Sequence, residues 1–245
     1  QMHQWLGELS QILPDSLHKK EWVTMLKDLT SAPTSWVRFF ARVMTFLFGK
    51  YGLLLIDSAD HQLRKLEKPF WEVLLTRNLE IQHRIKNNVL RVTDLGFPAP
   101  IQDKMNFAHL FLCLGGNRYP LYFDGITWSS PGTDREWTTS QMLELADVSP
   151  WKLSNSVMTR PLMQEYLFPT LAFVGGSSEV GYWGLLKDVF STCNIRMPIV
   201  YPRIQVTVVP NKIESRMNGF GITLYDLNHE FEAKKREWFK SQVRL

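Results

Sequence analysis

The feature that most constrains this chain is a strand, turn, helix and strand in succession. An apolar run at 170–174 is followed by a glycine pair, a helical pattern at about 178–192 and a second apolar run at 199–201. Two strands joined by a helix of this length pair in parallel with a right-handed crossover, because only a long connection returns the chain to the starting edge. The pattern predicts half of a doubly wound α/β sheet, whose ligands gather where the strands end.

The turn after the first of these strands is a candidate anion site. Gly175 and Gly176 allow a sharp turn, and Ser177 or Ser178 can cap the following helix. Free backbone N–H groups and the helix dipole would then favour a phosphate or a carboxylate. The turn lacks the Gly-Lys-Ser/Thr of a P-loop and the full G-x-G-x-x-G spacing, so a plain tight connection remains the alternative.

Three charged side chains lie next to this turn or at the ends of nearby elements. Glu179 falls in the first helical turn, where it can cap the helix or hold a substrate amine. Arg160 precedes a helix that starts at Pro161, and Arg203 follows the second strand. Two guanidiniums at one sheet edge form a fork for carboxylate or phosphate, although surface or interdomain ion pairs are an equal alternative. We expect the three side chains to converge on one cleft.

An earlier apolar run, 52–57, predicts another buried strand, which enters a helix at roughly 60–86. Asp57 and Asp60 follow this run in a position to act chemically, but helix capping by Ser58 or Asp60 is the favoured alternative. Residues 1 to about 50 predict helices that are broken near Pro14 and Pro33. The last of these helices has an apolar stripe that we expect to be buried. The stripe consists of Trp36, Phe39, Phe40, Val43, Phe46 and Leu47.

The sequence pattern changes between residues 87 and 150, where short apolar runs alternate with glycine, proline and asparagine. The runs at 110–114 and 120–123 flank GGNRY, which is typical of a hairpin loop, and QMLELAD predicts a short helix. These signals predict a small mixed α/β insert packed beside the main sheet. After Pro210, a charged helical pattern with near-heptad apolar spacing predicts the start of a coiled coil.

Net charge, cysteine content and the length of the apolar runs exclude several classes of function. The net charge of +4 suits anionic small ligands and is too small to indicate nucleic-acid binding. The two cysteines, Cys113 and Cys193, lie in apolar runs without further ligands nearby, so we expect buried thiols and neither a disulfide nor a metal site. No apolar run is long enough to span a membrane and no secretion signal is present, which predicts a cytoplasmic protein.

Longer stretches resemble the cysteine-adding enzymes of bacillithiol biosynthesis. The resemblance is carried by RPLMQEYLFPTLAF at 160–173, GGSSEVGYW at 175–183 and MPIVYPR at 197–203, and upstream by GLLLIDSADHQLR at 52–64. The sequence departs from the family pattern at Ser156, where the family has asparagine, and at Ser177-Ser178, where it has Pro-Gly. The family chain is about twice as long, so we expect an internal fragment with only part of the site.

The resemblance implies a ligase that adds L-cysteine to glucosaminyl-malate and completes bacillithiol, with ATP or another nucleotide suspected as the activating cofactor. It also implies a homodimer, and a partial Rossmann-like parallel sheet divided as 1–86 (helical segment and first core elements), 87–150 (insert), 151–221 (second half of the core) and 222–245 (coiled coil). Candidate substrate- or nucleotide-binding residues are Asn155, Ser156, Arg160, Gln164, Gly175, Gly176, Ser177, Ser178, Glu179, Tyr182 and Arg203. A non-catalytic nucleotide-binding or interaction fragment of a paralogue is the alternative.

Overall fold

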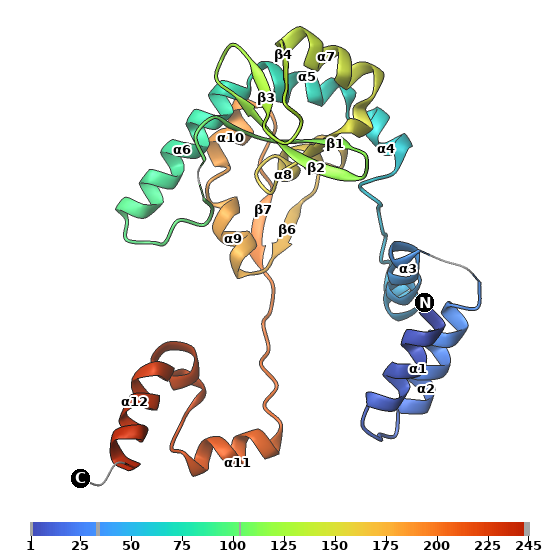
Figure 1. Cartoon of the computed structure of the whole chain (residues 1–245), viewed down its shortest axis with the longest axis vertical. Coiled ribbons are helices and arrows are strands. Elements are labelled where there is room, and N and C mark those ends of the chain that lie inside the picture. The colour runs from blue at the N-terminus through green and yellow to red at the C-terminus, as the bar shows by residue number, and fades with distance from the viewer. Residues whose placement is uncertain (1, 33–34, 103, 243–245) are drawn as a thin grey trace. The chain divides into compact units, whose positions relative to one another are not determined.

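The computed structural model describes residues 2–32, 35–102 and 104–242. The chain forms two compact units, residues 1–68 with 149–151, and residues 69–148 with 152–245 (Figure 1). The predicted break at Pro33 and the end of the predicted coiled coil at 243–245 lie outside the described residues. None of the described helices is both long and apolar enough to cross a membrane.

The first unit is helical. It contains α1 (Met2–Ile12), α2 (Lys19–Leu29), α3 (Trp36–Phe48), a 3-10 turn at Gly49–Tyr51 and α4 (His61–Leu66). Ser35 caps α3 by accepting a hydrogen bond from the Arg38 amide at 3.3 Å. The prediction that the whole apolar stripe of α3 is buried is wrong, because Phe39 is buried while Trp36, Phe40 and Phe46 are more than half exposed. α3 packs against α2 within this unit, which covers one face of the helix and leaves side chains on its other faces in solvent.

The predicted strand at 52–57 is not formed, and its four apolar residues, Leu53 to Ile56, are exposed. An apolar run becomes a strand only when a neighbouring strand accepts its backbone hydrogen bonds. None of the strand pairs in the described residues includes this segment. The single helix predicted at 60–86 is also wrong, since α4 is followed by α5 (Lys68–Thr76) and α6 (Asn78–Asp94).

The larger sheet of the second unit has five antiparallel strands in the order β4-β3-β2-β1-β5. Its strands are β1 (Phe107–Leu114), β2 (Asn117–Phe123), β3 (Trp128–Ser130), β4 (Arg135–Trp137) and β5 (Leu153–Asn155), and α7 (Thr139–Val148) follows β4. The predicted hairpin is confirmed: Leu114 pairs with Asn117 across Gly115 and Gly116, whose positive φ angles of 56° and 81° suit a type I′ turn.

The predicted parallel unit is also confirmed. β6 (Ala172–Gly175) and β7 (Ile199–Pro202) pair in parallel, from Ala172 opposite Ile199 to Gly175 opposite Pro202. The helix predicted between them is two helices, α9 (Ser177–Trp183) and α10 (Lys187–Thr192), separated at Gly184, and α8 (Arg160–Leu167) precedes β6. Within the described residues the parallel sheet has two strands, and the region predicted as a small insert forms the larger sheet together with β5.

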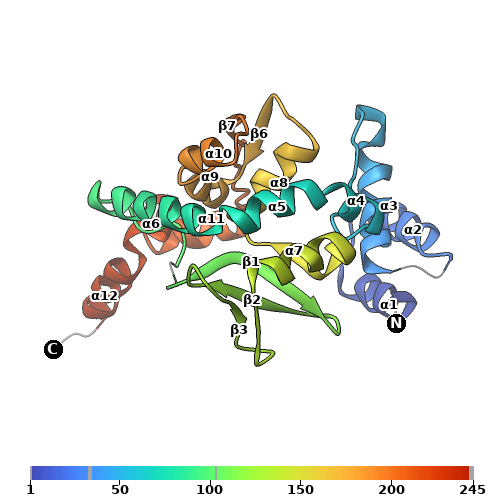
Figure 2. The same cartoon turned by 90° about the horizontal axis from the view of Figure 1, so that it is seen from above.

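Helices α5 and α6 lie between the two sheets (Figure 2). α6 contacts β1 on one side and α10 on the other. The fully buried side chains of Trp71, Leu74, Ile81 and Ile85 come from these two helices and fill the core that both sheets share. Each such side chain contributes roughly 1.5–3 kcal/mol by leaving water, so this helical layer holds the second unit together.

One face of the parallel pair packs on this core and the other is open. Phe173 and Val200 face the core, whereas Val174, Ile199 and Tyr201 are exposed. Beyond β7 the chain is extended and then forms α11 (Asn211–Gly219), a π-helical turn at Asp226–Glu230 and α12 (Phe231–Gln242). The coiled coil and the predicted domain boundaries stay predictions.

Candidate functional site

The predicted anion site lies at the carboxyl end of the parallel strands, and the Arg203 side chain lies against its glycine turn. The Arg203 amide donates to the Gly175 carbonyl at 2.8 Å, which extends the pairing of β7 with β6 by one residue. A Cβ atom added to Gly176 would lie 2.9 Å from Arg203 Nη2. The guanidinium therefore lies directly against the Gly176 backbone, and glycine is required there for this close approach.

Glu179, and neither serine, caps helix α9. Gly176 is the N-cap residue, and Glu179 Oε2 accepts a hydrogen bond from its amide at 2.9 Å. The prediction that Ser177 or Ser178 caps the helix is wrong, because the helix already begins at Ser177 and the glutamate satisfies the N-cap amide. Both serine side chains remain exposed, so their hydroxyls are accessible to a ligand.

Arg160, the first residue of α8, is held by two neutral oxygens and an aromatic ring. Its Nη1 donates to Gln164 Oε1 at 2.9 Å, and its Nη2 donates to the Tyr182 hydroxyl at 2.8 Å. The Phe173 ring centroid lies 5.9 Å from its Cζ, and that ring stacks on Trp183 at 4.3 Å. None of the carboxylates in the described residues forms an ion pair with Arg160, so its positive charge is oriented without being neutralised.

Phe173 lies next to Arg160 and next to the glycine turn that Arg203 contacts. Its ring lies against Arg160, and a Cβ added to Gly175 would lie only 2.8 Å from that ring. Arg203 and Glu179 meet at the neighbouring Gly176. The structure thus brings the two arginines, Glu179, the glycine pair and Phe173 to one end of the parallel pair. The guanidiniums have different partners, and a single cleft that holds one ligand between them stays a prediction.

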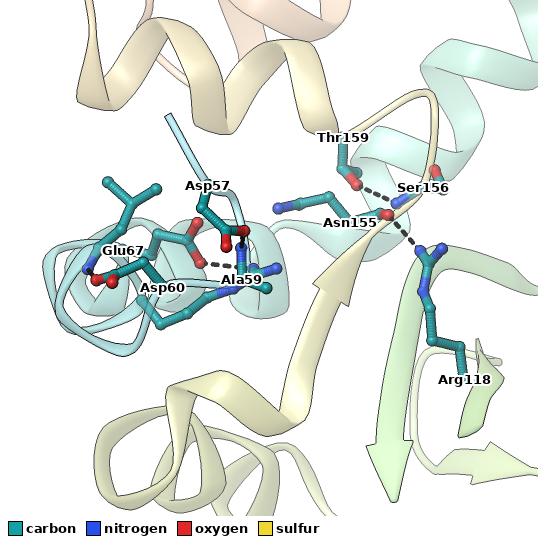
Figure 3. A network of polar contacts seen from close by, with 10 residues as sticks. Asp57, Ala59, Asp60, Glu67, Arg118, Asn155, Ser156 and Thr159 are labelled. Atoms are coloured by element: carbon teal, nitrogen blue, oxygen red, sulfur yellow. Dashed lines mark hydrogen bonds and ion pairs between the residues drawn. The ribbon is translucent and has the colours of Figure 1, made fainter. Parts of the chain in front are cut away.

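Asn155 and Ser156 lie at the junction between β5 and α8 (Figure 3). The Asn155 carbonyl accepts a hydrogen bond from Arg118 Nη2 at 2.9 Å, while its buried side-chain oxygen has no partner in the part of the chain that the structure describes. Ser156 is buried, and its hydroxyl accepts from the Met158 amide at 3.1 Å. Ser156 is therefore turned toward its own loop, whereas the Asn155 amide retains unused hydrogen-bonding capacity.

Asp57 and Asp60 make local backbone contacts (Figure 3). Asp57 Oδ1 accepts from the Ala59 amide at 2.8 Å, and Asp60 Oδ1 accepts from the amides of Gln62 and Leu63 at 2.8 and 3.2 Å. These contacts make Asp60 the N-cap of α4. The capping alternative is therefore confirmed for Asp60.

The cysteines and the metal-ligating side chains that the structure describes form no second centre. Burial raises the pKa of the Cys193 thiol to about 11, so this thiol stays protonated, and Cys113 is half-buried. Residues 2–32, 35–102 and 104–242 contain no group of three or more histidine, cysteine, aspartate or glutamate side chains placed to hold a metal ion. Sequence analysis did not single out Phe173, whose ring lies against Arg160, or Thr159, which precedes Arg160 and donates to the His109 carbonyl. None of these three residues belongs to a sequence pattern that indicates a site.

Comparisons with known proteins place this site in a family. Residues 1–204 match the family model described as Bacillithiol biosynthesis BshC, N-terminal Rossmann-like domain. Proteins named "Putative cysteine ligase BshC" are similar over nearly the whole chain: one from Shouchella clausii is 35% identical over 97% of this chain, one from Halalkalibacterium halodurans 32% over 98%, and one from Staphylococcus epidermidis 31% over 96%.

This chain spans somewhat less than half the length of these relatives, 44%, 45% and 43% respectively. The family model covers 204 of the 245 residues and includes every candidate site residue. The parallel pair, its glycine turn and the arginines at its carboxyl end therefore lie within the matched Rossmann-like domain. The chain belongs to the BshC family of bacillithiol biosynthesis.

Proposed function

We propose that this chain provides an anion-binding site of a ligase that adds L-cysteine to glucosaminyl-malate in the last step of bacillithiol biosynthesis. The observation that carries the proposal is the gathering of Arg160, Arg203 and the glycine turn at the carboxyl end of β6 and β7. Open α/β sheets bind ligands at this end. The names of the relatives supply the reaction class, a cysteine ligase.

The chemistry explains why cationic side chains are needed. Amide formation from a carboxylate requires activation, so the cysteine carboxylate would first take a phosphoryl or nucleotidyl group from a nucleotide such as ATP. The amine of glucosaminyl-malate would then attack the carbonyl carbon, phosphate or a nucleoside monophosphate would leave with one carboxylate oxygen, and the amine would give its proton to a base. Arginine suits the carboxylates of malate and the phosphates of a nucleotide, because its planar fork binds two oxygens at once.

Individual roles follow from charge and placement. Arg160 and Arg203 would bind anionic groups, and the turn from Gly175 to Ser178 would accept a phosphate or carboxylate. Asn155, Gln164, Glu179 and Tyr182 would contact amine, amide or hydroxyl groups, whereas the buried Ser156 hydroxyl is engaged by the Met158 amide and would shape the loop before α8. Glu179 already accepts the Gly176 amide through Oε2, which leaves Oε1 for an ammonium. The same proposal includes a cytoplasmic homodimer that associates through a coiled coil beginning in residues 222–245.

Calorimetric titration of this chain with ATP and with L-malate tests the binding step. We expect Arg160→Lys to weaken binding of at least one of these ligands by tenfold or more, because lysine keeps the charge and loses about one charge-assisted hydrogen bond. Arg135→Lys, on the exposed strand β4, is the matched control and should bind as the native chain does. Unchanged binding in both Arg160→Lys and Arg203→Lys would refute the proposed site.

A second candidate function is favoured by the Ser177-Ser178 departure from the Pro-Gly of the family pattern. A paralogue could keep nucleotide binding and lack ligation. The ligation assay uses the natural protein that carries this chain, with ATP, L-cysteine and glucosaminyl-malate. Amide product that disappears in Arg160→Lys supports the ligase, whereas ATP binding without product supports the non-catalytic alternative.

A further inference from the structure

A strained residue in β1 lies beneath the start of α8. His109 has a φ of +56°, a left-handed conformation that is uncommon outside glycine, and it is almost fully buried. The pairing of β1 with β2 is irregular between Phe107 and Phe111, so His109 lies in a bulge. Bulges re-aim groups next to functional sites, and strain persists only where the surrounding structure enforces it.

The bulge directs the His109 carbonyl at the loop before α8. That carbonyl accepts two hydrogen bonds, from the Ser156 amide at 3.1 Å and from Thr159 Oγ1 at 2.8 Å. Thr159 Oγ1 also accepts from the Ser156 amide at 3.1 Å (Figure 3). Thr159 has no exposed surface, so its hydroxyl serves these two contacts and is shielded from water.

Arg160 follows directly on this arrangement. The Arg160 amide donates to the Ser156 carbonyl at 2.9 Å, so its backbone is fixed by the same loop. Thr159 is the N-cap residue of α8 but makes no side-chain cap to the helix. Its hydroxyl bonds across to β1, which ties the first turn of α8 to the larger sheet. This hydrogen bond fixes the position of the Arg160 backbone, from which the side chain extends.

We propose that Thr159 is a positioning residue, whose hydroxyl anchors the first turn of α8 to the β1 bulge and thereby sets the place of the Arg160 guanidinium. The inference deepens the proposed function, because it rests on Arg160 as an anion-binding residue. From its anchored backbone, Arg160 meets Gln164 on its own helix and Tyr182 on α9 at hydrogen-bonding distance. Loss of the anchor would let the first turn shift, and a guanidinium displaced from both partners would bind anions less well.

The test uses Thr159→Val, which keeps the shape and removes the hydroxyl, and Thr159→Ser, which keeps the hydroxyl. The nitrogen and proton resonances of the Arg160 guanidinium report its hydrogen bonds without any ligand, and calorimetry with inorganic phosphate reports anion affinity. We expect Thr159→Val to shift these resonances and weaken phosphate binding by about tenfold, as for one lost charged hydrogen bond. Thr159→Ser should restore both.

Thr30→Val is the matched control, since Thr30 is also buried and its hydroxyl also donates to backbone carbonyls, those of Leu26 and Lys27. It should lower stability and leave the Arg160 resonances in place. Should Thr159→Val fail to fold, Thr159→Cys carries the same test with a weaker hydrogen bond. Native resonances in the folded variant that lacks the hydroxyl, or equal shifts in Thr159→Ser, would overturn the proposal.

The resonances separate this inference from the proposed function. If the guanidinium is displaced in Thr159→Val but neither this variant nor Arg160→Lys or Arg203→Lys alters phosphate binding, the positioning role holds and the anion site fails. If Arg160→Lys weakens phosphate binding while the Thr159 variants keep both native resonances and native affinity, the anion site holds and the positioning role is refuted.

Discussion

Acidification should weaken the second unit through His109. Burial lowers the pKa of this imidazole from its ordinary 6.5 to about 4, so the native structure keeps the ring neutral where the unfolded chain would charge it. The unfolded state therefore takes up a proton first as the pH falls. Stability should drop between pH 6.5 and about pH 4 and show no further loss from this group below that, because both states are then protonated.

The magnitude follows from these two pKa values. Between pH 7 and pH 5 the difference in proton uptake removes about 2 kcal/mol of unfolding free energy, since each pKa unit corresponds to about 1.4 kcal/mol. Native domains are stable by only about 5–15 kcal/mol, so the change is measurable. Urea denaturation, followed by the fluorescence of the buried tryptophans at a series of pH values, gives the slope.

His109→Asn is the matched variant, because asparagine tolerates a positive φ and does not titrate. The smaller side chain leaves a cavity that lowers the free energy of unfolding equally at every pH. The dependence of that free energy on pH is therefore compared between native chain and variant, and not its absolute value. Subtracting the two curves also removes the contribution of the carboxylates. Parallel curves for native chain and variant between pH 7 and pH 5 would refute a buried neutral imidazole at this position.

Three further outcomes are expected. Gly132→Ala should lower the melting temperature and cost about 1–3 kcal/mol, because a Cβ there would lie 2.3 Å from the Tyr119 ring; a native melting curve would contradict that packing. Cys193 should resist alkylation at pH 8 in the folded chain, with a rate about a hundredfold below that of an unfolded control, because its pKa is raised to about 11; mass spectrometry of the labelled peptide decides this. Gly176→Ala should displace the Arg203 guanidinium and weaken phosphate binding in calorimetry with little change in stability, and unaltered affinity would argue against Arg203 as a ligand.

The sequence by itself determined features that depend on local chemistry. The connection between the apolar runs ending at Val174 and Tyr201 required a parallel pair, because no short turn lies between them. Gly115-Gly116 specified a tight hairpin because both residues need a positive φ. The placement of Arg203 beside the glycine turn also followed, since both lie at the carboxyl ends of paired strands.

Only the tertiary structure decided features that depend on partners distant in the sequence. The run from Leu53 to Ile56 is as apolar as a core strand, yet no described strand pairs with it, and the pattern of one segment cannot reveal whether a partner exists. The contacts of Arg160 with Tyr182 and Phe173 join residues of three elements, and the bulge at His109 arises from the mismatch between two strands. Side-chain chemistry specifies what a residue can bind, and packing across the fold decides what it meets.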